Sequence, residues 1–171
     1  MHNPAIRFAS PGDIDAVTQI MAEAVRLLPS RDWYLDDDAS ALHRYIREDG
    51  YILVYDAEGD IAGFLLVRHP GLSEENLGRH MDLNEEELLH AAHMESAAVS
   101  QRFRGRGILR QLLEEAVLIE KEAGQTRHFF ATVHPDNHFC KNNLEAVGFE
   151  TLTTLKKYGD WVRDIVYRPM R

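Results

Sequence analysis

The sequence predicts one α/β domain, of the α+β type, built on a mixed sheet in which most neighbouring strands are antiparallel. Apolar residues at helical spacing alternate with short β-branched and aromatic runs, in the order strand, two helices, three strands, helix, strand, helix and two strands. In the middle of this order a strand, a loop and a helix lead to another strand, and such a crossover makes neighbouring strands parallel. The length of 171 residues suits a single domain with its own core, so residues 1–171 are expected to form one unit.

The first elements are a short strand over Ile6–Ala9 and a helix that follows it. The segment Ser10-Pro11-Gly12-Asp13 offers a hydroxyl N-cap, a proline at the first helical position and an acid at the third, which together indicate a helix start. Apolar residues then recur at helical spacing as far as Leu28. A second helix is expected from about Asp38 to Glu48.

Two strands joined by a tight turn come next. Tyr51–Tyr55 and Ile61–Val67 are β-branched and aromatic runs, and the polar, glycine-containing residues between them have the composition of a hairpin turn. The segment from His69 to about Ala92 is too long for a simple turn and is expected to be partly helical. Its acidic run Glu85–Glu87 is interpreted as a solvated face, with a lid over a cationic substrate as the alternative.

The second half of the chain supplies the crossover and a closing hairpin. His93–Val99 is predicted as a strand and Gln101–Gly107 as a loop, before a helix whose apolar face begins at Leu109 and which ends at Gly124. The remaining elements are a strand over His128–Val133, a helix over Asn137–Val147 ended by Gly148, and strands over Phe149–Lys157 and Trp161–Arg168 that turn at Tyr158-Gly159-Asp160.

The glycine loop Arg104-Gly105-Arg106-Gly107-Ile108-Leu109 has the features of a phosphate site. It lies between a strand and an amphipathic helix, where unpaired N–H groups and the helix dipole favour an anion. Arg102, Arg104, Arg106 and Arg110 add positive charge, and the glycines allow close approach of the backbone. No Lys-Ser or Lys-Thr and no third glycine follow, so the spacing excludes a nucleotide-hydrolase loop and a dinucleotide fingerprint. The alternative is a plain glycine turn with basic neighbours.

The stretch from Met94 to Phe149 resembles the GNAT superfamily of N-acetyltransferases. In that family a strand leads into Arg-Gly-x-Gly-x-Gly/Ala, a long helix, another strand, an asparagine and a terminal Gly-Phe. The matching segments here are Glu95–Val99, Arg104–Leu109, the helix to Glu122, His128–Val133, Asn137 and Gly148-Phe149. Ile6–Leu28 is similar to the opening strand and helix of the family, and the closing hairpin also falls where the family has one.

The resemblance implies a mostly antiparallel sheet of about seven strands that splays at its parallel pair, with helices on both faces and the thioester in the splay. It implies acetyl-CoA as co-substrate, with no metal. Loop amides would hold the pyrophosphate, the preceding strand would pair with the pantetheine arm, and an asparagine would lie near that arm. The implied cofactor residues are Ala97, Ala98, Val99, Arg104, Gly105, Arg106, Gly107, Ile108, Leu109, Arg110 and Asn137.

Two residues depart from the family pattern. Leu109 stands where the family usually has glycine or alanine, which crowds the loop but leaves the amides available. Leu144 stands where many members carry a tyrosine that protonates the departing thiolate. The usual general acid is therefore missing.

Acetyl transfer to an amine needs a base for the amine proton and a donor for the oxyanion. Glu95 is the predicted base, because many members place an acid at this point of the strand, and alternation is expected to put His93 and Ala97 on its face. Its alternative role is that of an arginine partner or a solvated strand-end acid. His134 is the second candidate base, since imidazole titrates near neutrality, or else a plain loop histidine.

Tyr158 is the first candidate for the acid, because the closing hairpin could turn its hydroxyl toward the sulfur. A contact within the turn is its alternative role, and Cys140 is a weaker candidate. A thiolate can also leave without protonation by the enzyme. The oxyanion donor is expected to be a backbone N–H around Ala98 or Val99.

The composition restricts partners and compartment. A net charge of -9 argues against nucleic acid and favours a cationic acceptor. One cysteine, no apolar run of membrane-spanning length and no signal-peptide pattern at the N-terminus predict a cytoplasmic protein without a membrane partner. Acidic segments such as Asp36-Asp37-Asp38 are compatible with a polyamine, an aminoglycoside, a lysine side chain or a protein N-terminus.

The predicted function is transfer of an acetyl group from acetyl-CoA to a primary amine of a small molecule or peptide, by direct attack. The alternative is a non-catalytic acyl-CoA-binding sensor or subunit, which the loss of the tyrosine at Leu144 permits. A structural domain that binds no CoA is a third possibility. A homodimer is common in the family and remains open here.

Overall fold

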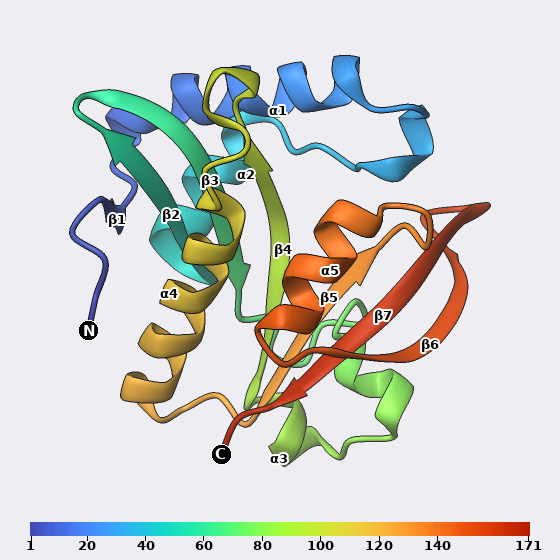
Figure 1. The fold of residues 1–171 in the computed structure, drawn as a ribbon. Helices are drawn as coiled ribbons and strands as arrows, with labels where there is room; N and C mark the ends of the chain where they lie inside the picture. The colour runs from blue at the N-terminus through green and yellow to red at the C-terminus, as the bar shows by residue number, and fades with distance from the viewer.

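The computed structural model describes residues 1–171 and contains one sheet of seven strands with helices on both faces (Figure 1). The strands are β1 (Ile6–Phe8), β2 (Gly50–Ala57), β3 (Asp60–Arg68), β4 (Ala91–Val99), β5 (His128–Val133), β6 (Glu150–Lys157) and β7 (Trp161–Pro169). Their order in the sheet is β1-β2-β3-β4-β5-β7-β6. Every neighbouring pair is antiparallel except β4 and β5. The predicted mixed, mostly antiparallel sheet is confirmed.

Two groups of helices cover the sheet. The α-helices are α1 (Ile14–Leu27), α2 (Ala39–Arg44), α3 (Glu85–Leu88), α4 (Ile108–Ala123) and α5 (His138–Ala146). Single 3-10 turns cover Pro11–Asp13, Arg31–Trp33, Leu77–Met81 and Gln101–Phe103, and a π turn covers Tyr45–Asp49. Apolar residues of α1 and α2 pack on one face, in a cluster with Phe64 and Leu66 of β3. Residues of α4 and α5 pack on the other face, in a cluster with Leu65 and Val67.

The predicted start of the first helix is confirmed, although it begins as one 3-10 turn. The N–H of Ser10 donates to Asp13 at 2.7 Å, and the guanidinium of Arg7 donates to both oxygens of that carboxylate at 2.8 and 2.9 Å. Hydrogen bonding from Arg7 lowers the pKa of Asp13 to about 2. The helix entry is therefore held by an ionised capping residue.

Several element bounds differ from those predicted. The second helix is shorter, because the α-helix ends at Arg44 and the chain widens into the π turn before β2. The strand predicted over His93–Val99 begins two residues earlier, at Ala91. The segment 69–92 is partly helical, as predicted, and includes α3. None of the helices combines the length and apolar character needed to cross a bilayer.

The parallel strands β4 and β5 pair over only part of their length. Their register runs from Ala91 opposite His128 to Met94 opposite Ala131, and no pair follows. The remaining residues of β4 stay paired with β3. The two parallel strands therefore splay after Met94, as the family resemblance implied.

A β-bulge in β4 falls at the same point. Opposite β3, the register moves from Leu66 with Ser96 to Val67 with Met94, which leaves Glu95 as the extra residue. The expectation that Ala97 shares the face of Glu95 is wrong, because the bulge shifts the alternation and Ala97 packs with Met94 in the core beneath α4.

Candidate active site

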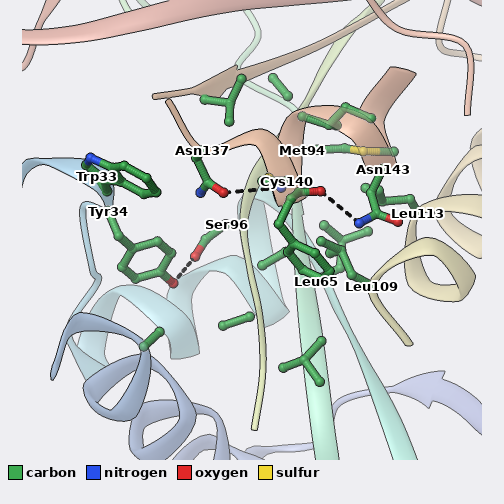
Figure 2. Close-up of a pocket in the computed structure, with 18 of the residues that line it drawn as sticks. Trp33, Tyr34, Leu65, Met94, Ser96, Leu109, Leu113, Asn137, Cys140 and Asn143 are labelled. Carbon is green, nitrogen blue, oxygen red and sulfur yellow. Dashed lines mark hydrogen bonds between the residues drawn. The ribbon is translucent and has the colours of Figure 1, made fainter. Parts of the chain in front are cut away.

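A cavity of about 480 Å³ occupies the splay between β4 and β5. Its walls come from the loop after α1, the end of β4, the start of α4 and the first turns of α5. Figure 2 shows Tyr34 and Ser96 on one side of this cavity, with Leu109 and Leu113 of α4 on the other. The cavity is mainly apolar, and the charged side chains in its lining are Asp37, Glu95, Arg104, Arg110 and Arg163.

The glycine loop presents backbone amides that have no acceptor. Gln111 donates the first bond of α4, to the carbonyl of Gly107 at 3.1 Å, so the amides of residues 108–110 have no helical acceptor. The amides of Gly105, Arg106 and Gly107 make no backbone hydrogen bond either. Gly105 and Gly107 have φ of +79° and +70°, a region that favours glycine. An anion fits this arrangement without displacing any hydrogen bond of the protein.

The arginines of the loop divide into two groups. Arg104 and Arg110 line the cavity, whereas Arg106 does not. The guanidiniums of Arg102 and Arg106 lie over the ring of Phe103, at 5.2 and 5.1 Å from its centre. The predicted contribution of Arg106 is therefore limited to its backbone amide.

The free edge of β4 turns alternate amides toward the splay. Ser100 donates to the carbonyl of Ala62 in β3, at 2.8 Å, and backbone groups alternate in direction along a strand. The amides of Ala97 and Val99 consequently point away from β3, while that of Ala98 points toward it. Of the two amides considered for the oxyanion, that of Val99 therefore faces the cavity.

Helix α5 brings three of the predicted positions to the cavity. The side chain of Asn137 accepts from the amide of Cys140 at 3.2 Å and so caps this helix (Figure 2). Leu144 is buried and also lines the cavity, with no hydroxyl to offer. Burial raises the pKa of the Cys140 thiol to about 11, which keeps the thiol protonated.

Glu95 lies in the cavity wall beside His93 and Arg68. The buried Nε2 of His93 accepts from the amide of Leu77 at 3.0 Å, so in the neutral ring Nδ1 carries the proton and donates to Glu95 at 3.3 Å. Burial lowers the pKa of His93 and favours this neutral form. Burial opposes ionisation of Glu95, but His93 and Arg68, whose Nη1 is 3.8 Å away, outweigh it and lower the pKa of the carboxyl. Glu95 is therefore an ionised carboxylate at neutral pH.

The other two predicted acid–base residues lie in different settings. His134 does not line the cavity: its ring stacks on Trp33 at 5.1 Å, and Nε2 lies 3.6 Å from Asp32. These contacts correspond to the structural alternative for this histidine. Tyr158 does line the cavity, at a hairpin turn where its φ is 54°. Burial and the nearby charge of Glu95 raise the pKa of its hydroxyl, which therefore stays protonated.

Other polar residues line the cavity besides the predicted catalytic and cofactor residues, and Tyr34, Ser96 and Asp37 are among them. The hydroxyl of Tyr34 makes a short hydrogen bond to Ser96 inside the cavity (Figure 2). Asp37 lies further along the same loop and lines the cavity too. Burial and the charge of Glu95 raise the pKa of Asp37 to about 6. In the sequence, Asp36-Asp37-Asp38 stands out only as an acidic segment compatible with a cationic acceptor, and no signal indicates Tyr34 or Ser96.

The acidic run Glu85–Glu87 is remote from the cavity. Glu87 pairs with Arg127 at 2.6 Å and with His128 at 2.7 Å, at the amino end of β5. The splay lies at the opposite end of that strand. The run is therefore not a lid over the site.

Comparisons with known proteins agree with this geometry. A sequence model described as the Acetyltransferase (GNAT) family matches residues 17–149. The fold is similar to that of a putative acetyltransferase, yncA, from Salmonella typhimurium, solved with its cofactor acetyl-CoA (TM-score 0.73, 18% identity, covering 99% of this chain and 95% of that one). It is also similar to a ribosomal-protein-alanine N-acetyltransferase from Brucella melitensis (TM-score 0.71, 23% identity, 96% and 98%).

An N-acetyltransferase from Staphylococcus aureus Mu50 has the same fold, with a TM-score of 0.72 and 18% identity over 97% of this chain and 98% of that one. A comparison with proteins of curated function finds no match. The family match extends from α1 to the start of the closing hairpin and includes the glycine loop, the splayed strands and Asn137. The chain belongs to the GNAT family of acetyltransferases.

Proposed function

We propose that this protein transfers an acetyl group from acetyl-CoA to a primary amine, by direct attack of the amine nitrogen on the thioester. The observation that carries the proposal is the row of free amides from Gly105 to Arg110 at the mouth of an apolar cavity between splayed strands. A pyrophosphate fits the amides, and an extended pantetheine arm fits the unpaired edge of β4. Acetyl-CoA supplies the activated acyl group.

The residues of the protein hold this substrate at three points. Arg104 and Arg110 add charge beside the loop amides and line the same cavity. The outward amides of Ala97 and Val99 are available to the pantetheine and to the carbonyl oxygen as it gains negative charge. Asn137 lies on the opposite wall, at the start of α5.

Glu95 is the proposed base. Its carboxylate accepts a proton from the acceptor ammonium, and the neutral nitrogen then forms a C–N bond as the C–S bond breaks. The nitrogen loses its second proton when the amide forms. One of the two protons released from the nitrogen is delivered to the thiolate, and the other leaves to solvent. The net products are an N-acetyl amide, free CoA thiol and one proton.

Tyr158 is the proposed proton donor to the thiolate, in place of the tyrosine that is absent at Leu144. Its hydroxyl is protonated and lines the cavity that also contains Glu95. Tyr34 is the competing donor, because its hydroxyl and that of Ser96 form a hydrogen-bonded pair in the same cavity. His134 is not given a catalytic role, since it does not line the cavity, and its ring stacks on Trp33 and lies beside Asp32 instead.

The proposal is tested by thiol release from acetyl-CoA with a panel of primary amines. Glu95→Gln is expected to lower kcat by about 10²-fold or more, as for loss of a general base, with acetyl-CoA affinity retained. Glu86→Gln, on the exposed first turn of α3, is the matched control and should leave the rate unchanged. Equal rates for Glu95→Gln and the wild type would exclude Glu95 as the base.

The second candidate function is a non-catalytic acyl-CoA sensor, which the buried Leu144 favours because the usual acid is missing. It predicts that acetyl-CoA binds tightly while no amine in the panel releases thiol. Failure of the folded wild type to bind acetyl-CoA at all would refute both functions.

A further inference from the structure

A second, smaller cavity adjoins the one in the splay. It has a volume of about 210 Å³ and shares part of its wall with the larger cavity. The charged residues common to both are two carboxylates, Asp37 and Glu95. The shared wall is therefore negatively charged, and it lies where an acceptor amine must meet the thioester.

The part of the small cavity away from the shared wall carries the opposite charge. Arg44, Arg68 and Lys157 line only the small cavity. Glu75 lies there too, but it is paired with Arg68 at 2.7 Å. The small cavity thus has carboxylates on the wall that it shares with the larger cavity and cations on the rest of its lining. Arg68 reaches toward the shared wall, with Nη1 3.8 Å from Glu95, and Arg44 is paired with Asp49 at 3.1 Å, so Lys157 is the cation without a partner.

Two of these cations have unused capacity. Lys157 forms no ion pair, and its Nζ lies 5.2 Å from the centre of the Tyr158 ring. The Nε of Arg68 is buried and has no hydrogen-bond acceptor. A buried donor without an acceptor is costly, but this nitrogen has almost no accessible surface, so Lys157 is the cation that a ligand anion can reach.

The carboxylate end also has an unused group. Asp37 takes part in no ion pair, although Arg31 holds Asp36 at 2.6 Å and Asp38 caps α2. Acids surround it: Glu95 faces it from β4 and its two sequence neighbours flank it, while Arg44 of α2 is the opposing cation. A cationic group placed between Asp37 and Glu95 would relieve this repulsion.

We propose that the acceptor is a compact amino acid, bound by its ammonium between Asp37 and Glu95 and by its carboxylate near Lys157. This inference rests on the proposed acetyl transfer and specifies its acceptor. The volume of the small cavity, about 210 Å³, suits such a compact molecule. The polyamines considered from the sequence have no anionic group for the far end of the cavity.

The experiment compares acceptors that differ only in the carboxylate. Thiol release is measured with a panel of α- and ω-amino acids and with the amine that corresponds to each after loss of CO₂. We expect kcat/KM for the best amino acid to exceed that of its matched amine by tenfold or more. Lys157→Met should raise KM for the amino acid about tenfold and leave KM for the amine unchanged. Lys156→Met, at an exposed neighbouring position that lines neither cavity, is the control and should change neither value.

The outcomes separate this inference from the function on which it rests. Amines that react as well as amino acids, or a Lys157→Met effect that is equal for both acceptors, would overturn the inference and leave acetyl transfer intact. If no acceptor releases thiol although acetyl-CoA binds, the proposed transfer fails and the inference fails with it. Lys157→Gln provides a second variant if the methionine variant does not fold.

Discussion

Replacing Gly107 by alanine tests the cofactor loop with a built-in comparison at the other end of the same helix. Gly107 precedes α4 and Gly124 follows it, with φ of +70° and +68°. A Cβ at Gly124 would meet nothing within 4 Å, and one at Gly107 would meet only Gln111, at 3.9 Å. Both substitutions therefore carry the same backbone strain and no steric clash, but only Gly107 lines the cavity.

The structure gives different magnitudes for stability and for binding. A left-handed conformation costs a residue with a Cβ about 1 kcal/mol, so each variant should lose about 2–4 °C in Tm. Gly107 lines the cavity and its own amide is one of the free ones, so a Cβ there would stand beside the proposed position of the pyrophosphate. Loss of one charge-assisted hydrogen bond to a phosphate is worth about 1.5–3 kcal/mol, which corresponds to roughly 10- to 150-fold weaker binding.

The assay pairs isothermal titration calorimetry with acetyl-CoA and thermal unfolding of the unliganded proteins. Gly107→Ala is expected to raise Kd by at least tenfold, whereas Gly124→Ala should bind as the wild type does. Similar Tm losses in the two variants would show that strain is matched. Equal affinities for acetyl-CoA in the two variants would refute the assignment of the pyrophosphate to this loop.

Three further predictions concern acid–base groups. Because the pKa of Asp37 is raised to about 6 and its ionised form is proposed to hold the acceptor, kcat/KM should rise as pH increases through about 6, and Asp37→Asn should remove this inflection. Tyr158→Phe should lower kcat by about tenfold or more without weakening acetyl-CoA binding, and a drop in Tyr34→Phe instead would transfer the donor role to that residue. Asp13→Asn should lower the free energy of unfolding by about 1 kcal/mol at neutral pH, after allowance for the half-exposed Arg7. Because the folded-state pKa is the lower one, this loss should shrink below pH 3.8 and vanish near pH 2 in denaturant titrations.

Local sequence signals were sufficient for most of the fold. Glycines with positive φ stand at both ends of α4, and apolar residues at helical spacing fill its buried face. The position of this helix could therefore be predicted from its own segment of the sequence. The bulge at Glu95 was not readable, because it exists only in the register between β3 and β4, which are separated by more than twenty residues of chain. That missing register explains why Ala97 was assigned to the wrong face.

The cofactor loop and the polar residues of the cavity also differ in how far the sequence could predict them. The cofactor loop is one continuous segment, so its glycines, arginines and helix-start amides can be recognised together in the sequence. The hydrogen bond between Tyr34 and Ser96 joins residues 62 positions apart, and it forms only because the loop after α1 crosses the end of β4. The chemical type of His134 suggested a base, but its stacking on Trp33 depends on the same crossing and could not be inferred from composition.

The bulge also explains how one strand can serve both cavities. In a regular β4, Met94 and Ser96 would share one face of the sheet, and Glu95 between them would have its own partner on β3. The extra residue falls where β4 leaves β5, so the carboxylate of Glu95 reaches the wall that the two cavities share. His93, two residues earlier, keeps its pairing with Arg68 of β3. The amide of Leu77 donates to Nε2 of His93, so Nδ1 carries the proton and donates to Glu95. Glu95 is thereby held ionised by a hydrogen bond from His93 and by Arg68 at 3.8 Å, and its carboxylate still lines the wall that an incoming ammonium would meet.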